Sequence, residues 1–253
     1  MASRFWTGRI FPALALSALV IVGAFAIAPA FAPHLAPPGE TPIFVQPARM
    51  AEKHIRAASA PVDLVFIGDS ITQNYELYAP VWDAFYGQRN ALNLGYGMDT
   101  TGATLWRIAQ GELDGISPKV AVILIGTNNT NLGRGVVETV AGVKAVVAAA
   151  QAHLPRSKIL LLGILPSGKS VGKSKADAEI NARLAGYYSG NKDVTFLDIA
   201  PVFIRRGALD LSLYVEQPPE GALHPNPRGQ AAMAAAIEPT LARLLGDHAR
   251  TAP

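Results

Sequence analysis

The sequence predicts an α/β fold, in which a parallel sheet of about five strands is covered by helices on both faces. Short, continuous apolar runs recur along the chain, at 62–67, 91–94, 120–125, 158–162 and 194–197. Such runs are typical of strands buried on both faces, and stretches with helical spacing separate them. Polar turns follow the first three runs, at the strand ends where sheets of this kind bind ligands.

The individual elements follow from local patterns. The first apolar run, VDLVFI, ends at Gly-Asp-Ser, and the third, VAVILI, ends at Gly-Thr-Asn. A helix is expected at 136–152, because this Ala- and Val-rich stretch places Glu138 and Lys144 outside its apolar residues. The stretches 175–188 and 227–245 have helical spacing as well, and each follows one of the later strands or loops.

The composition excludes several classes of protein. Half of the 253 residues are hydrophobic and only 16% are charged, which is unlike a disordered chain. The chain has no cysteine, so disulfides, Cys-ligated zinc, iron–sulfur clusters and a thiol nucleophile are all excluded. The net charge of +3 comes with no long basic run, so a nucleic-acid partner is not expected.

The N-terminal region has the pattern of an export segment. Arg4 and Arg9 precede an uncharged apolar stretch at about 10–33, which is long enough to span a bilayer. Its two Ala-x-Ala sites, at 26–28 and 30–32, are each followed by proline. Cleaved signal and retained anchor therefore both stay open as interpretations.

The domain boundaries follow from this pattern. We expect an export signal or membrane anchor at 1–33, an extended proline-rich linker at 34–47, and the α/β domain at 48–253. The arginines would keep the N-terminus in the cytoplasm and send the domain outward. The expected location is the periplasmic or extracellular face, with possible inner-membrane anchorage through 10–33.

Four polar segments are candidates for chemistry, and each also has an ordinary structural interpretation. Ser70, in GDSIT, could be a nucleophile or a plain helix cap. The glycine-rich turn at 93–101 could aim a backbone N–H at a carbonyl oxygen, and Asn128, in GTNN, could donate to an oxyanion. Of the five histidines, His224, in LHPNPRG, is the one placed to act as a general base.

Taken in order, these segments resemble the SGNH (GDSL-type) hydrolase family, most of all the esterases similar to platelet-activating-factor acetylhydrolase catalytic subunits. The similar phrases lie between 64 and about 245 and include FIGDSITQ, LNLGYGMDTTGATLWRIAQGELDGISPKVAVILIGTNN and LHPNPRG. The resemblance implies a flavodoxin-like three-layer α/β/α sandwich and a serine esterase with no metal and no cofactor. It also implies that Ser70 is the nucleophile, His224 the base, and Asn128 and the Ser70 N–H oxyanion donors.

Two positions depart from the family's pattern. Where the family has a glycine in the second segment, this chain has Met98, which keeps its backbone N–H as an oxyanion donor. Its long side chain would narrow the acyl pocket or require a negative φ. Where the family has an aspartate three residues before the histidine, this chain has Gly221. We expect Glu220 to orient His224 instead, with a Ser–His dyad held by a backbone carbonyl as the alternative.

Further carboxylates and other functions stay open. Asp210 and Glu216 are weaker candidates than Glu220 for the orienting acid.

The stretch 163–170, GILPSGKS, fits the phosphate-loop pattern and would indicate a nucleotide hydrolase. Against this, VGKS at 171–174 is expected to separate the motif from its helix, and the motif follows the fourth strand. Lys169 and the two lysines that follow the motif, Lys173 and Lys175, are then expected to form a solvated basic loop.

The resulting prediction is an exported serine esterase that works through an acyl-serine intermediate on short-chain esters. The substrate would be a small-molecule or glycan ester. An O-acyltransferase is the alternative, since it would use the same Ser–His site and differ only in the acyl acceptor.

Overall fold

The computed structural model describes Met1 and residues 39–215 and 221–251. The predicted export segment, most of the predicted linker, Glu216 and Glu220 lie outside these residues. A five-stranded parallel sheet is the centre of the fold, in the order β2-β1-β3-β4-β5. Its strands are β1 (Leu64–Gly68), β2 (Ala91–Gly95), β3 (Val120–Leu124), β4 (Lys158–Leu162) and β5 (Val194–Leu197). The predicted α/β class is therefore confirmed, and this strand order is that of flavodoxin-like sheets.

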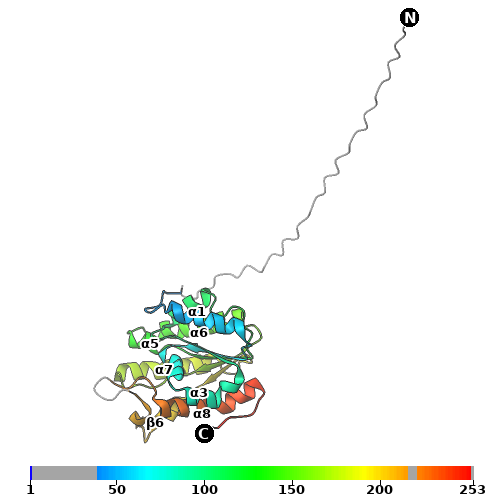
Figure 1. Cartoon of the computed structure of the whole chain (residues 1–253). Coiled ribbons are helices and arrows are strands. Elements are labelled where there is room, and N and C mark those ends of the chain that lie inside the picture. The colour runs from blue at the N-terminus through cyan, green and yellow to red at the C-terminus, as the bar shows by residue number, and fades with distance from the viewer. Residues whose placement is uncertain (2–38, 216–220, 252–253) are drawn as a thin grey trace. The chain divides into compact units, whose positions relative to one another are not determined.

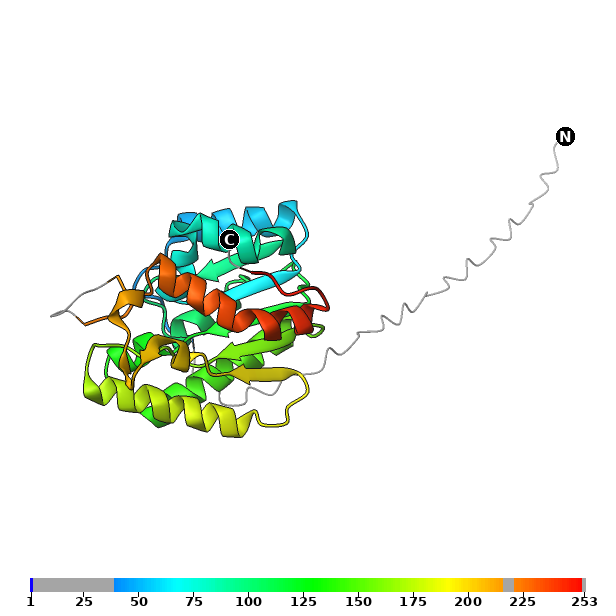
Figure 2. The same cartoon turned by 90° about the horizontal axis from the view of Figure 1, so that it is seen from below.

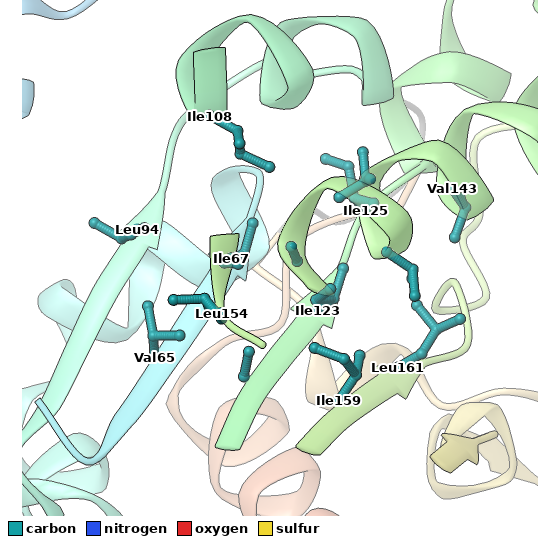
Figure 3. Close-up of a cluster of buried hydrophobic side chains, with 14 of the residues drawn as sticks. Val65, Ile67, Leu94, Ile108, Ile123, Ile125, Val143, Leu154, Ile159 and Leu161 are labelled. Carbon is teal, nitrogen blue, oxygen red and sulfur yellow. The ribbon is translucent and has the colours of Figure 1, made fainter. Parts of the chain in front are cut away.

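One face of the sheet is covered by four long helices. These are α1 (Pro47–Ser59), α4 (Thr101–Ala109), α6 (Val136–His153) and α7 (Val171–Tyr187). Figure 3 shows how Ile108 and Val143 from the helices meet Ile67, Ile123 and Leu161 from the strands. Burying an aliphatic side chain of this size contributes roughly 1.5–3 kcal/mol, so this interface is a main source of stability.

The opposite face carries α3 (Ala79–Phe85) and α8 (Pro227–Leu245). Figure 1 shows α3 and α8 on the other side of the sheet from α1 and α6, and Figure 2 shows α8 lying across its face. Aromatic rings fill the space beside α3, where Phe66 and Tyr86 lie 4.7 Å apart between ring centroids. The guanidinium of Arg89 joins α8 to this layer through Glu238, at 2.7 Å to each carboxylate oxygen.

Short elements occupy the edge of the sheet where the strands end. The four-residue α2 (Ser70–Gln73) follows β1, and α5 (Thr127–Asn131) follows β3. β1 and β3 are neighbours in the sheet, and this is where the strand order reverses, the usual ligand position in such folds. The remaining elements are η1 (Asn74–Leu77), η2 (Gly87–Arg89), η3 (Ala200–Phe203), β6 (Ile204–Arg205), β7 (Ala208–Leu209) and η4 (Leu211–Leu213).

The structure differs from the expected element boundaries in one informative place. Helix α7 begins at Val171, directly after the GILPSGKS stretch, rather than near Lys175. The Ser170 hydroxyl oxygen accepts a hydrogen bond from the Lys173 N–H at 3.0 Å, and this cap starts the helix despite Gly172. Within the described ranges, no helix is both long enough and apolar enough to cross a bilayer.

Candidate active site

Ser70 lies at the first position of α2, directly after the end of β1. Asp69 caps this helix, since its carboxylate accepts a hydrogen bond from the Ile71 N–H at 2.9 Å. The turn needs the glycine at 68, because a Cβ there would lie 2.3 Å from the Thr72 hydroxyl and 2.5 Å from the Leu124 carbonyl oxygen. The tight turn leaves Ser70 half-buried, with its own N–H at the start of a helix.

His224 reaches Ser70 from the segment before α8. Its Nε2 lies 3.0 Å from the Ser70 Oγ, although the two residues are 154 positions apart. The backbone around His224 is fixed on both sides. Its carbonyl accepts from the Val215 N–H at 2.9 Å, and Asn226 caps α8 through the Gly229 N–H at 3.1 Å. The structure thus brings together the two residues expected to be nucleophile and base.

The turn at 96–99 presents one backbone donor. The Gly97 N–H donates to the Gln73 side-chain oxygen at 2.6 Å, and the Asp99 N–H donates to the Tyr96 carbonyl at 3.2 Å. The Met98 N–H, between them, has no hydrogen-bond partner among residues 39–215 and 221–251. It is therefore the N–H of this turn that is available to an oxyanion.

The sequence left two expectations for Met98, a narrowed acyl pocket or a negative φ, and the backbone of Met98 differs from the second. Its φ is +65°, in the left-handed region, so the expected negative φ is wrong. The tight turn between β2 and α4 requires this region, which the family's glycine reaches freely and a methionine reaches at a cost of about 1 kcal/mol. The methionine side chain is half-buried beside the turn.

Asn128 lies on α5 and is 1% exposed. Its Nδ2 donates to the Asp99 carbonyl oxygen at 2.9 Å. An amide has two N–H bonds, so this contact engages one of them and fixes the direction of the other. The Asn128 side chain and the Met98 N–H are thereby joined through Asp99, the residue next to Met98.

A buried lysine supports the helix that carries Asn128. The Lys173 Nζ contacts the hydroxyls of Thr127 and Thr130 at 3.1 and 3.0 Å, and the Asp177 carboxylate at 2.6 Å. Lys173 is only 6% exposed, so its expected place in a solvated loop is wrong. Its ammonium is buried because a carboxylate and two hydroxyls satisfy it.

Burial perturbs the two carboxyls nearest the site. It raises the pKa of Asp69 to about 7, and the Asp99 carboxylate adds to the rise, while the Ile71 N–H and Lys173 oppose it. Its Oδ2 is buried without a hydrogen-bond partner in the described part of the chain. Burial also raises the pKa of Asp99 to about 6, although the guanidinium of Arg107 contacts both carboxylate oxygens and opposes this.

The raised pKa of Asp69 predicts a pH-dependent stability effect of Asp69→Asn. The ordinary pKa is 3.8 and the folded one about 7, so between these values the folded state holds more protons. Wild-type stability from this group is therefore lost as pH rises from about 4 to about 7. The free energy of unfolding of Asp69→Asn, minus that of wild type, should therefore rise by about 2–4 kcal/mol between pH 4 and pH 7. Urea unfolding at several pH values measures it. The exposed Asp83→Asn is the control, and a pH-independent difference would contradict the prediction.

The predicted orienting acid, Glu220, lies outside the described residues, as does Glu216. Asp210, the third candidate, uses its carboxylate elsewhere. It accepts from the Ser212 hydroxyl at 2.7 Å and pairs with Arg205 at 3.2 Å. In the described ranges no group of three or more acidic or histidine side chains is arranged to hold a metal ion.

Three backbone donors of the GILPSGKS stretch are engaged in the fold and are therefore not available to a phosphate. The Gly163 N–H donates to the Leu197 carbonyl at 3.0 Å, and the Gly168 N–H donates to the Ala222 carbonyl at 2.7 Å. The Ile164 N–H donates to the Asn181 side chain at 2.8 Å. The loop therefore uses these donors to hold the fold together, next to the segment that leads to His224.

A flavodoxin-like α/β sandwich with a serine–histidine pair at the carboxyl ends of its strands has the arrangement of a serine hydrolase. Residues 66–232 match the GDSL-like lipase/acylhydrolase family, and the chain belongs to this family. The resemblance found in the sequence is thereby confirmed.

Several relatives are similar to this chain. The alpha2 subunit of platelet-activating factor acetylhydrolase IB from Gallus gallus is 35% identical over 143 residues, which cover 56% of this chain and 61% of that protein. The chain thus spans less than two thirds of this relative's length.

Solved structures are similar to the fold as well. A GDSL-like lipase from Bacteroides thetaiotaomicron matches with a TM-score of 0.61 and 21% identity, covering 78% of this chain and 98% of that chain. A carbohydrate esterase family 3 protein from Talaromyces cellulolyticus matches with a TM-score of 0.54 and 18% identity, covering 74% and 100%. At these identities, the similarity supports the fold alone.

Proposed function

We propose that this chain is an exported serine esterase that removes short acyl groups from small-molecule or glycan esters through an acyl-serine intermediate. The observation that carries the proposal is the 3.0 Å separation of Ser70 Oγ and His224 Nε2. A nucleophile and a base at hydrogen-bond distance are the minimum requirement for this chemistry. The pair lies at the edge of the sheet where β1 and β3 end, as do the oxyanion donors proposed here.

The first half of the reaction forms the acyl-enzyme. Ser70 Oγ attacks the ester carbonyl carbon while His224 Nε2 takes the hydroxyl proton. The carbonyl oxygen becomes an oxyanion, which accepts hydrogen bonds from the N–H groups of Ser70 and Met98 and from the Asn128 amide. His224 then gives its proton to the leaving alcohol as the ester C–O bond breaks. In the second half, water attacks the acyl-Ser70 carbonyl, with His224 again acting as base, and the free acid leaves.

A short acyl group on a small-molecule or glycan ester fits three observations. The Gallus gallus relative is named as an acetylhydrolase, and the Talaromyces cellulolyticus structure is that of a carbohydrate esterase. The half-buried Met98 side chain also stands where the family has glycine, which reduces the space beside this oxyanion donor. The export part of the proposal rests on Arg4, Arg9 and the apolar stretch 10–33.

Covalent labelling tests both parts. A phosphonate ester should place one phosphonyl group on Ser70 of the purified full-length protein and stop hydrolysis of p-nitrophenyl acetate. A charged phosphonate that does not cross the cytoplasmic membrane should label Ser70 in intact cells. Peptide mass spectrometry locates the adduct, and the exposed Ser117→Ala is the control that keeps both labelling and activity.

The outcomes separate the two parts. Full hydrolysis without an adduct on Ser70 would overturn the acyl-Ser70 mechanism proposed here. Labelling of the purified protein but not of intact cells would overturn export alone.

A further inference from the structure

Residues 39–46, which we call the arm, precede α1 and lie outside the region that matches the family. The arm makes specific contacts with the domain, which differs from the extended linker expected at 34–47. The Glu40 N–H donates to the Gly102 carbonyl at 3.1 Å. The guanidinium of Arg107 donates to the carbonyl oxygens of Phe44 and Val45 at 2.9 and 2.7 Å. In Figure 1 the arm is part of the blue segment that leads into α1.

The packing of the arm on α4 depends on two glycines. A Cβ at Gly39 would lie 2.7 Å from the Trp106 backbone nitrogen. A Cβ at Gly102 would lie 2.6 Å from the Glu40 Cγ. Real Cβ atoms do not approach other atoms this closely, so both positions leave room for the arm. The arm therefore packs directly against α4 at these two glycines.

Glu40 connects two segments of the site. Its carboxylate accepts a hydrogen bond from the Thr100 hydroxyl and contacts the Arg134 guanidinium at 2.8 Å through each oxygen. Thr100 caps α4 and follows the turn that carries Met98. The Arg134 N–H donates to the Asn129 carbonyl at 2.9 Å, on the helix that carries Asn128. Glu40 thus links the segments that hold the two non-serine donors.

Arg107 makes a second connection to the same place. Its guanidinium contacts both Asp99 carboxylate oxygens, at 2.7 and 2.9 Å, and lies 3.7 Å from the centre of the Tyr96 ring. Asp99 is the residue whose carbonyl accepts from Asn128 and whose neighbour is Met98. A third contact joins Gln46 to the Gln73 amide at 3.4 Å, and Gln73 in turn accepts from the Gly97 N–H.

We propose that the arm is a clamp on the oxyanion hole, with Glu40 and Arg107 as positioning residues that act through Thr100, Arg134 and Asp99. The proposal rests on the function proposed above. Donors stabilise an oxyanion only within about 2.7–3.1 Å, so a small displacement of Met98 or Asn128 weakens them in the transition state. Because the oxyanion forms only there, loosening the clamp lowers kcat and leaves KM nearly unchanged.

The test uses Glu40→Ala in the full-length protein with p-nitrophenyl acetate. We expect kcat to fall about tenfold, with KM within about twofold of wild type. Glu40→Gln keeps an acceptor for the Thr100 hydroxyl but loses the ion pair with Arg134, so its kcat should fall about threefold. The control is Glu179→Ala, which breaks an exposed ion pair between Glu179 and Arg183 (2.6 Å) within α7 and should keep wild-type kcat.

A double-mutant cycle separates a clamp from general destabilisation. If Glu40 acts through the oxyanion donors, kcat of the Glu40→Ala, Asn128→Ala double variant should fall by less than the product of the two single losses, because the part of the Glu40 effect that runs through Asn128 is already lost. The clamp would be overturned if the kcat losses of the two single variants multiply in the double variant. It would also be overturned if Glu40→Ala lowers Tm but leaves kcat at 25 °C unchanged. If Glu40→Ala does not fold, Arg134→Gln breaks the same ion pair from the other side and carries the same expectations.

The failure of the clamp is distinct from the failure of the proposed function. If Ser70→Ala is inactive while Glu40→Ala and Arg134→Gln keep wild-type kcat, only the clamp is wrong. If Ser70→Ala keeps full activity, the proposed function is wrong.

Discussion

Ser70→Ala is expected to lower kcat for p-nitrophenyl acetate by at least about 10⁴-fold, because no acyl-enzyme can form without the hydroxyl. His224→Ala should lose about as much, since the Ser70 hydroxyl, 3.0 Å from His224, is a weak nucleophile until a base takes its proton. The double variant should lose little more than either single one, because the two residues act as a unit. Initial rates of p-nitrophenol release measure all three variants.

The controls for this prediction come from the same molecule. Ser117→Ala and His153→Ala replace an exposed serine and an exposed histidine, and each should keep wild-type kcat. Both substitutions in the site are small and at half-buried positions, so the fold should survive, which thermal unfolding verifies. A Ser70→Ala variant with more than a tenth of wild-type kcat would contradict the role given to this residue.

The sheet and two of the site positions could be predicted because they depend on local sequence. Continuous apolar runs identify strands that are buried on both faces, and the residues after such strands must lie at one edge of a parallel sheet. Ser70 and Asn128 follow β1 and β3, which are neighbours, so their closeness is a consequence of strand order. The apolar pattern alone does not give that order, and the resemblance to a known family supplied it.

Other features depend on contacts between distant segments, which no local pattern reports. Lys173 looks like a member of a basic loop in the sequence, but Asp177, Thr127 and Thr130 converge on it and permit its burial. The proline-rich composition around Glu40 suggests a free linker, yet Glu40 packs closely over Gly102 on α4. A glycine inside a helix lowers the stability of that helix, so Gly102 is a weak signal that another segment packs there.

The left-handed conformation of Met98 illustrates a different limit. Sequence reasoning assigns positive φ to glycine, and a methionine argues against it. The contacts of its neighbours decide the matter here, because the Gly97 and Asp99 N–H groups are both bonded and hold the turn in shape. The fold thus tolerates about 1 kcal/mol of strain at the position of the proposed oxyanion donor.

Asn128→Ala is expected to lower kcat about 10²–10³-fold, with a much smaller change in KM. The substitution removes the amide N–H that we propose donates to the oxyanion, and it also removes the hydrogen bond to the Asp99 carbonyl, 2.9 Å from Nδ2. Steady-state kinetics with p-nitrophenyl acetate measure the effect. Asn128→Asp should lose at least as much, because a carboxylate oxygen cannot donate to either acceptor and repels the oxyanion.

The matched control is Asn131→Ala, which removes an exposed asparagine from the same short helix, α5, and should leave kcat within about twofold of wild type. Met98→Gly provides the comparison for the other donor, because it keeps the backbone N–H and relieves the strain at φ +65°. If the two donors act together on the oxyanion, Met98→Gly should keep kcat within about threefold while Asn128→Ala loses two orders of magnitude. Equal losses in Asn128→Ala and Asn131→Ala would instead mean that α5 is merely destabilised, and the oxyanion role of Asn128 would be wrong.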